Sequence, residues 1–175
     1  STLSSSSAAS DVYKRQWLGH EIAHAVRYSA PGTQSLVPQA TERAPPWLFW
    51  DAVESLPLAE RFLDEGLATA FSRAVAPAST DEAILGMSPD ALEWLEAHGA
   101  ELLSRRASEW DLDCANPSSE RLCYSLWEDP DRWEPPWSFD RPPSRWGYFV
   151  GERFFAPRSH SAVSYTHLTL PTKRI

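Results

Sequence analysis

Two histidines four residues apart mark the part of the sequence that could do chemistry. His20 and His24 stand in "GHEIAH", with Glu21 directly after the first of them. Residues four apart lie on one face of an α-helix, so two imidazoles placed this way can bind a single metal ion. Glu21 would then lie beside the metal and could take a proton from water, which is the logic of an HExxH site. The alternative is a helix with two buried histidines that bind no metal.

A catalytic zinc site also needs a third protein ligand and a position for water. The metzincin continuation would have Gly at 27 and His at 30, where this chain has Arg27 and Ala30. Glu42 is one candidate ligand, but it runs into two prolines, which disfavour a packed helix. Glu65 stands in the apolar-patterned segment "FLDEGLATAFS" and is the favoured ligand. Its alternative is an ordinary surface carboxylate.

The segments "GHEIAHAVR" and "FLDEGLATAFS" together resemble the gluzincin pattern, in particular bacterial predicted zinc-dependent proteases whose ligand glutamate stands in an E-G-L-A motif. The segment "GYFVGERFF" is similar to the C-terminal helix of those proteins. The resemblance implies that His20, His24 and Glu65 bind Zn²⁺ and that Glu21 is the general base in peptide-bond hydrolysis. It also implies a zincin-like fold, in which this chain would carry the catalytic helices of an α+β metallopeptidase domain. The Trp- and Pro-rich interval between the motifs departs from that family, which leaves substrate preference open.

Two further side chains are candidates for stabilising the oxyanion of such a reaction. Tyr148 is the first candidate, and His160 is the second. Tyr148 could instead be a packed aromatic residue, and His160 a solvated loop residue. We expect Asp64 to point away from the metal, either solvated or behind the ligands.

Helices are expected to position these residues, and no strand is identified, so the sequence predicts a mainly α fold. Helices are predicted over residues 17–28, over a short segment from 45 or 46, over 57–76, from 89 with Ser88 as N-cap, and over 145–155 with Ser144 as N-cap. An extended loop is predicted over 114–143, because five prolines lie close together after Trp127; the loop either lines a cleft or covers the helices. Gly66 lies inside a predicted helix, where glycine costs up to about 1 kcal/mol relative to alanine. We therefore expect it to allow close contact with the histidine helix.

Both ends of the chain resemble translated sequencing adapters, on the strength of "DVYKRQ" near the start and "VSYTHL" near the end. The alternative is that residues 1–16 and 163–175 are genuine disordered tails. On the adapter interpretation, residues 17–162 are an N-terminally truncated zincin-like catalytic domain from a longer gene. His167 then belongs to no site.

Composition limits the remaining function classes. Hydrophobic content of 42% and nine tryptophans indicate a globular domain, and a net charge of −8 argues against nucleic acid as a partner. No apolar run is long enough to span a bilayer. Cys114 and Cys123 predict either a disulfide in an exported or periplasmic protein or two free thiols in a cytoplasmic one.

The expected partner is a peptide or protein substrate, and the sequence predicts neither its identity nor the oligomeric state. A catalytically inactive helical binding module that retains the zincin framework is the alternative function. A purely structural zinc site is disfavoured, because such sites are usually closed by four Cys or His ligands. Glu21 separates these interpretations, since only the enzyme needs a base there.

Overall fold

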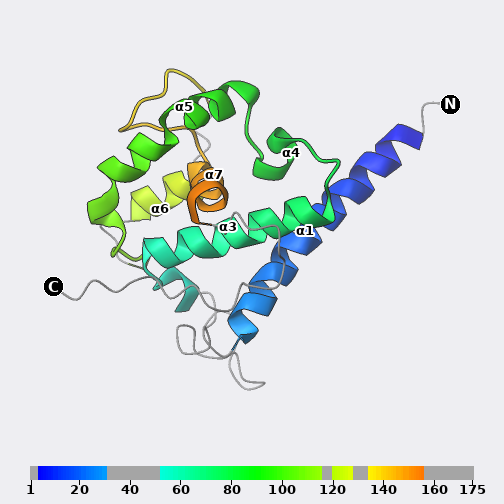
Figure 1. Cartoon of the computed structure of the whole chain (residues 1–175), viewed down its shortest axis with the longest axis horizontal. Helices are drawn as coiled ribbons and strands as arrows, with labels where there is room; N and C mark the ends of the chain where they lie inside the picture. Colours follow the sequence, from blue (N-terminus) through cyan, green and yellow to red (C-terminus); the bar gives the residue numbers. More distant parts are fainter. Residues whose placement is uncertain (1–3, 31–51, 116–119, 128–133, 156–175) are drawn as a thin grey trace.

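The computed structural model describes residues 4–30, 52–115, 120–127 and 134–155, and these form a mainly helical fold (Figure 1). Its elements are α1 (Ser4–Ser29), α3 (Leu58–Val75), α4 (Asp81–Leu85), α5 (Pro89–Arg105), the 3₁₀-helix η1 (Ala107–Glu109), α6 (Glu120–Trp127), α7 (Trp146–Val150) and the π-helix η3 (Gly151–Phe155). A helical turn also covers 52–54. Within the described ranges the only β-pairing is an isolated bridge between Pro57 and Asp113. The predicted mainly α class is confirmed.

Helix α3 is the central element, with α1 against one side and α7 and η3 against another (Figure 1). Pro57 precedes it with the extended backbone that proline favours, and every residue from Phe62 to Thr69 is buried. The helix predicted over 57–76 is therefore confirmed. An ordinary surface helix buries one stripe, whereas α3 is covered on several sides.

The main hydrophobic core lies between α3, α5, α6 and α7. Phe62 packs against Trp127 and Trp146, with ring centroids 5.9 and 5.7 Å apart. Leu95 and Leu102 of α5 are fully buried in the same cluster. This core packs α7 against α3, and η3 follows directly on α7.

Two glycines allow α3 and η3 to touch through their backbones. A Cβ on Gly66 would lie 2.2 Å from the carbonyl carbon and oxygen of Gly151, and a Cβ on Gly151 would lie 2.4 Å from the oxygen of Phe62. The expectation that Gly66 faces the histidine helix is therefore wrong, because it faces η3. The glycine that brings α1 close to α3 is Gly19, whose Cβ would lie 2.6 Å from Val75 Cγ2.

Replacing Gly66 with alanine is expected to destabilise the protein by about 3 kcal/mol, since the new methyl group meets backbone that no rotamer change can move. Gly99→Ala is the matched control. Its Cβ would meet side-chain atoms of Phe149 and Phe154 and no backbone, the nearest being Phe149 Cε1 at 3.2 Å, and alanine is the better helix former. Urea unfolding of both variants measures the difference. Equal stability of the Gly66 variant and the wild type would show that the helices do not touch here.

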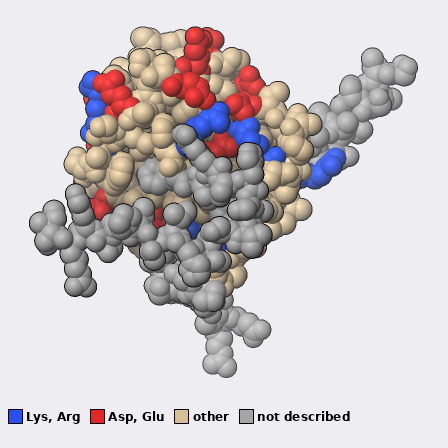
Figure 2. All heavy atoms as spheres, in the orientation of Figure 1, with Lys and Arg blue, Asp and Glu red and all other residues tan. Residues whose placement is uncertain are grey.

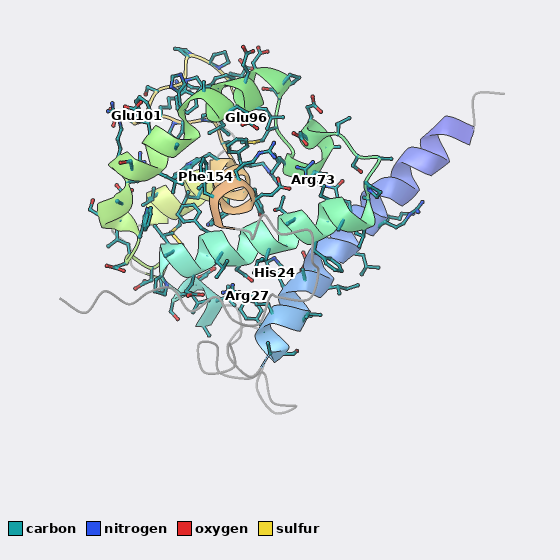
Figure 3. The ribbon with its side chains drawn as sticks, viewed as in Figure 1. His24, Arg27, Arg73, Glu96, Glu101 and Phe154 are labelled. Atoms are coloured by element: carbon teal, nitrogen blue, oxygen red, sulfur yellow. A yellow bond between two sulfur atoms is a disulfide. The ribbon has the colours of Figure 1, made fainter. Side chains whose placement is uncertain are left out.

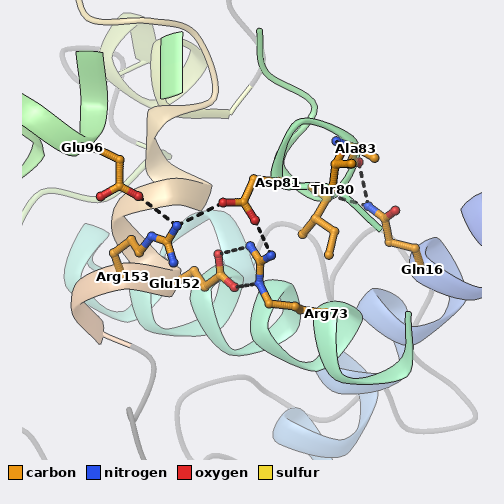
Figure 4. Close-up of polar contacts among 9 residues, drawn as sticks. Gln16, Arg73, Thr80, Asp81, Ala83, Glu96, Glu152 and Arg153 are labelled. Atoms are coloured by element: carbon orange, nitrogen blue, oxygen red, sulfur yellow. Dashed lines mark hydrogen bonds and ion pairs between the residues drawn. The ribbon is translucent and has the colours of Figure 1, made fainter. Parts of the chain in front are cut away.

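An ion-pair network fixes η3 to the neighbouring helices (Figure 4). Arg73 of α3 donates to both oxygens of Glu152 and to Asp81 at the start of α4. Arg153 pairs with Asp81 at 3.2 Å and with Glu96 of α5 at 2.8 Å. The carboxylates of Glu152 and Asp81 raise the pKa of the Arg73 guanidinium above its usual range. The network therefore ties α3, α4, α5 and η3 together around the Gly66–Gly151 contact.

Helix α1 starts earlier than the predicted Trp17, because neither proline nor glycine interrupts residues 4–18. Gln16 is buried, and its amide donates to the carbonyl oxygens of Ala83 and Ile84 at 2.9 and 3.2 Å. The structure thus continues the helix through residues that the sequence suggests are a tail. Their origin in an adapter stays a prediction.

The apolar side of α1, formed by Leu18, Ile22 and Val26, is exposed. The side that faces α3 carries Gly19 and the two histidines instead. The end of α1 at Ser29, just before Pro31, agrees with the prediction.

The start of α5 is confirmed, since the Ser88 side chain accepts a hydrogen bond from the Ala91 N–H. The capping role predicted for Ser144 is wrong. The N-cap of α7 is Arg145, with a φ of 64°, and no side chain caps it. The short helix predicted from 45 or 46 falls largely outside the described residues.

The loop predicted over 114–143 is wrong in its middle, where α6 covers Glu120–Trp127 and ends before the five prolines that suggested the loop. Residues 134–143 have the predicted irregular backbone. A disulfide joins Cys114 to Cys123 and so ties the start of this region to α6. Of the two predicted states of these cysteines, the structure has the disulfide.

Acidic side chains gather over α5 on the face shown in Figure 2, with basic groups among them. This mixture agrees with a solvated acidic surface. No helix in the described part of the chain combines the length and the apolar character that a bilayer span requires.

Candidate metal centre

Helices α1 and α3 bring His20, His24 and Glu65 together. The Nε2 atom of His20 lies 3.1 Å from Glu65 Oε2, and the Nε2 atom of His24 lies 3.5 Å from the same oxygen. Ligands about 2.0–2.1 Å from a tetrahedral Zn²⁺ are about 3.3 Å from one another. The separations of 3.1 and 3.5 Å lie on either side of that value.

The three ligand atoms all lie within 4.8 Å of one another, so this group could hold a metal ion. They come from two turns of α1 and one of α3, and Gly19, next to His20, lets α1 approach α3 at Ser72 and Val75. The side chains of His20, His24 and Glu65 are 20%, 15% and 11% exposed. The set is therefore sheltered yet still reachable from solvent. Sequence reasoning predicted all three of these residues, and the structure brings them together.

Asp64 holds His24 from the opposite side of its ring. His24 Nδ1 lies 3.1 Å from Asp64 Oδ2, while its Nε2 faces Glu65. Tyr28 donates a short hydrogen bond to Asp64, and the Arg27 guanidinium lies 3.0 Å from the other Asp64 oxygen. A carboxylate behind a ligand histidine fixes both the ring orientation and the tautomer. Of the two expectations for Asp64, solvation is wrong, because it is 2% exposed, and the place behind the ligands is correct.

Arg27 connects this group to a further carboxylate. Its other guanidinium nitrogen pairs with Glu60 at 2.6 Å. Figure 3 shows Arg27 and His24 one turn apart on α1 where it lies beside α3. Positions 20, 24, 27 and 28 form one polar stripe on α1, and positions 60, 61, 64 and 65 form the facing stripe on α3. This stripe-to-stripe pattern is the signal that sequence reasoning missed for Arg27 and Tyr28.

The electrostatics of the group favour a positive charge between its carboxylates. Burial alone would lower the pKa of His24, but Asp64 and Glu65 outweigh it and raise that pKa to about 10. Burial would likewise raise the pKa of Glu65, yet the two histidines hold it well below its usual range. Burial opposes ionisation of Asp64 too, and His24 and Arg27 lower its pKa. Both carboxylates are therefore ionised, and in the metal-free protein a proton on His24 supplies the charge that a bound cation would otherwise supply.

The pKa of Tyr28 is raised well above its usual range, first by burial and then by the nearby Asp64 charge. The phenol therefore keeps its proton and remains a donor to Asp64. This donor helps to fix the carboxylate that holds His24.

A cavity of about 210 Å³ opens beside the cluster. Glu21, His24 and Glu65 line it together with Asp64, and Ala25, Tyr28 and Val53 complete the lining. Glu21, the predicted base, therefore lines the same cavity as His24 and Glu65, two of the three predicted ligands. A substrate group bound in this cavity would lie close to the base and to these two ligands.

The ring of Tyr148, in α7, lies close to the His20 imidazole, with ring centroids 5.9 Å apart. Trp127 packs edge-on against Tyr148 at 5.2 Å, and the Arg145 guanidinium lies over the Tyr148 ring. Tyr148 is therefore a packed aromatic residue that also borders the site. Glu42, His160 and His167 lie outside the described residues.

The stability of the metal-free protein is expected to depend on pH through this group. The pKa of His24 is raised from 6.5 to about 10, so its contribution is complete below pH 6.5 and is lost as pH rises toward 10. The lowered pKa values of Asp64 and Glu65 have the opposite sign, and their contribution is lost as pH falls below the usual carboxylate range. Thermal unfolding with a chelator present should therefore give the highest Tm near pH 5–6.5.

His98, on the far side of the core in α5, provides the control for that experiment. His98→Ala should keep the alkaline decline in Tm, whereas His24→Gln should remove it. A wild-type Tm that stays constant between pH 6.5 and 10 would mean that His24 is not held between the two carboxylates.

The chain matches no family model, no curated protein and no solved structure. The functional assignment therefore depends on the sequence motifs and on the geometry of this site.

Proposed function

We propose that this protein is a zinc-dependent peptidase in which His20, His24 and Glu65 hold the metal and Glu21 is the general base. The observation that carries the proposal is the approach of both imidazole Nε2 atoms to one Glu65 oxygen, at 3.1 and 3.5 Å. A second glutamate lines the adjoining cavity, as a base requires.

The donor set favours zinc. Two imidazoles and one carboxylate, with a fourth position open, are typical of catalytic zinc sites, whereas structural sites are closed by four Cys or His ligands. When bound, zinc would polarise the scissile carbonyl and lower the pKa of water toward about 7. The Asp64 carboxylate behind His24 supports the same assignment, since ligand histidines usually have such a partner.

The residues of this chain would divide the remaining work between them. Glu21 accepts a proton from the attacking water and later returns it to the departing amine. Tyr148 is the candidate donor to the oxyanion, supported by its place beside His20. Asp64 keeps the His24 ring aligned, and Arg27 and Tyr28 keep Asp64 in place.

The packing of a histidine helix on a glutamate helix supports a zincin-like catalytic domain of the gluzincin type. The described helices would then be the helical part of an α+β metallopeptidase, and the substrate a peptide or protein. The Cys114–Cys123 disulfide favours an exported or periplasmic location, because such bonds persist in oxidising compartments.

The proposal is tested with protein stripped of metal by a chelator and then restored with one equivalent of zinc. Cleavage of a mixture of fluorogenic peptides should appear on restoration and should not appear with magnesium. A protein that binds zinc but cleaves nothing would instead favour the inactive binding module.

A further inference from the structure

Arg61 lies one helical turn before Glu65 and faces the oxygen that the histidines do not use. Its guanidinium is 3.8 Å from Glu65 Oε1, while both histidines approach Oε2. The two oxygens of the carboxylate therefore face different partners. No other described carboxylate lies within 4.0 Å of the Arg61 guanidinium, so Glu65 is its ion-pair partner in the described part of the chain.

The Arg61 side chain is itself held in place. It is 13% exposed, and its guanidinium carbon lies 5.5 Å from the centroid of the Trp127 ring. A cation over an indole face is attracted to it. Trp127 has little freedom to move, because two of its ring atoms lie 2.5 and 2.8 Å from the place where a Gly147 Cβ would be.

This arrangement suits a ligand carboxylate that must present one oxygen. Without a partner for Oε1, the Glu65 carboxylate could rotate and exchange its oxygens, or it could turn away from the histidines. Ligand carboxylates are normally hydrogen-bonded by outer groups, and loss of such a partner typically weakens metal binding 10- to 100-fold. The Arg61–Glu65 contact, at 3.8 Å, is an ion pair longer than a hydrogen bond, so we expect an effect at the lower end of that range.

We infer that Arg61 is a positioning residue for the metal ligand Glu65, attracting Oε1 so that Oε2 stays directed at His20 and His24. The inference rests on the proposed zinc site and deepens it. Arg61 acts through Glu65, and it contacts neither the metal nor the substrate in this account.

The test measures the dissociation constant for zinc by competition with a chromophoric chelator. Arg61→Gln should raise it about 10-fold, and Arg61→Lys, which keeps the charge, should restore most of the affinity. Arg61→Met removes the charge but keeps an apolar side chain against Trp127, so it should lose as much zinc affinity as Arg61→Gln. It serves as the second variant in case Arg61→Gln does not fold. The control is Arg105→Gln, because Arg105 also lies over an aromatic ring and pairs with a glutamate four residues away.

A purely structural role for Arg61 would lower the Tm without changing zinc affinity in the folded variants. Zinc binding by the wild type together with unchanged affinity in the Gln and Met variants would overturn the inference alone. An equal loss in Arg105→Gln would overturn it as well, because the effect would not be specific to Glu65. Failure of the wild type to bind zinc would overturn the proposed function and this inference together.

Discussion

Glu21→Gln is expected to lower peptide hydrolysis by about 10²- to 10⁴-fold while zinc remains bound, which is the range that a positioned general base contributes. The substitution keeps the size and hydrogen-bonding ability of the side chain and removes its capacity to take a proton. Glu21 lines the cavity beside His24 and Glu65 and does not belong to the ligand cluster. Metal content should therefore be unchanged.

The measurement is kcat/KM with a cleaved peptide, alongside the zinc content of the purified variant. Glu101→Gln is the control, because this exposed glutamate of α5 pairs only with Arg105 in the described structure. Hydrolysis at the wild-type rate in Glu21→Gln would remove Glu21 as the base. If the wild type and Glu21→Gln both cleave the peptide no faster than the uncatalysed reaction, the inactive binding module is favoured.

Glu65→Ala should weaken zinc binding by more than about 100-fold, since loss of a ligand exceeds the effect of losing an outer contact. The variant also leaves the charge on buried His24 without one of its two carboxylate partners. Glu65→Gln separates the two effects, because it keeps a ligand-sized group and removes only the charge. Calorimetric titration with zinc measures each affinity.

Glu42→Ala provides the comparison for the other glutamate that the sequence offered as a ligand. It should bind zinc as the wild type does. Loss of zinc in Glu42→Ala with retention in Glu65→Ala would exchange the two assignments.

The ligand set could be predicted from the sequence because its spacing has a direct geometric meaning. His20 and His24 are one helical turn apart, and Glu65 lies in a helix whose apolar pattern and proline boundary are unambiguous. The histidine pair needed only the periodicity of one helix and the known needs of zinc, and Glu65 was chosen with the added support of the resemblance to the gluzincin pattern.

Contacts between helices were harder to predict. Gly66 was correctly identified as a point of close approach, but the sequence does not say which neighbour approaches, and the structure has Gly151 there. The fixed place of Asp64 likewise depends on the register between α1 and α3, which decides that Arg27, Tyr28 and His24 all face it. Helix α6 was missed because the density of prolines after it dominated the interpretation of the whole segment.

The central claim is that two imidazoles and one carboxylate from α1 and α3 share a single metal ion. Anomalous diffraction at the zinc edge, from crystals of the reconstituted protein, tests this most directly. The account predicts one peak about 2.0–2.2 Å from His20 Nε2, His24 Nε2 and Glu65 Oε2. No peak at this place, or zinc bound only elsewhere on the protein, would contradict it.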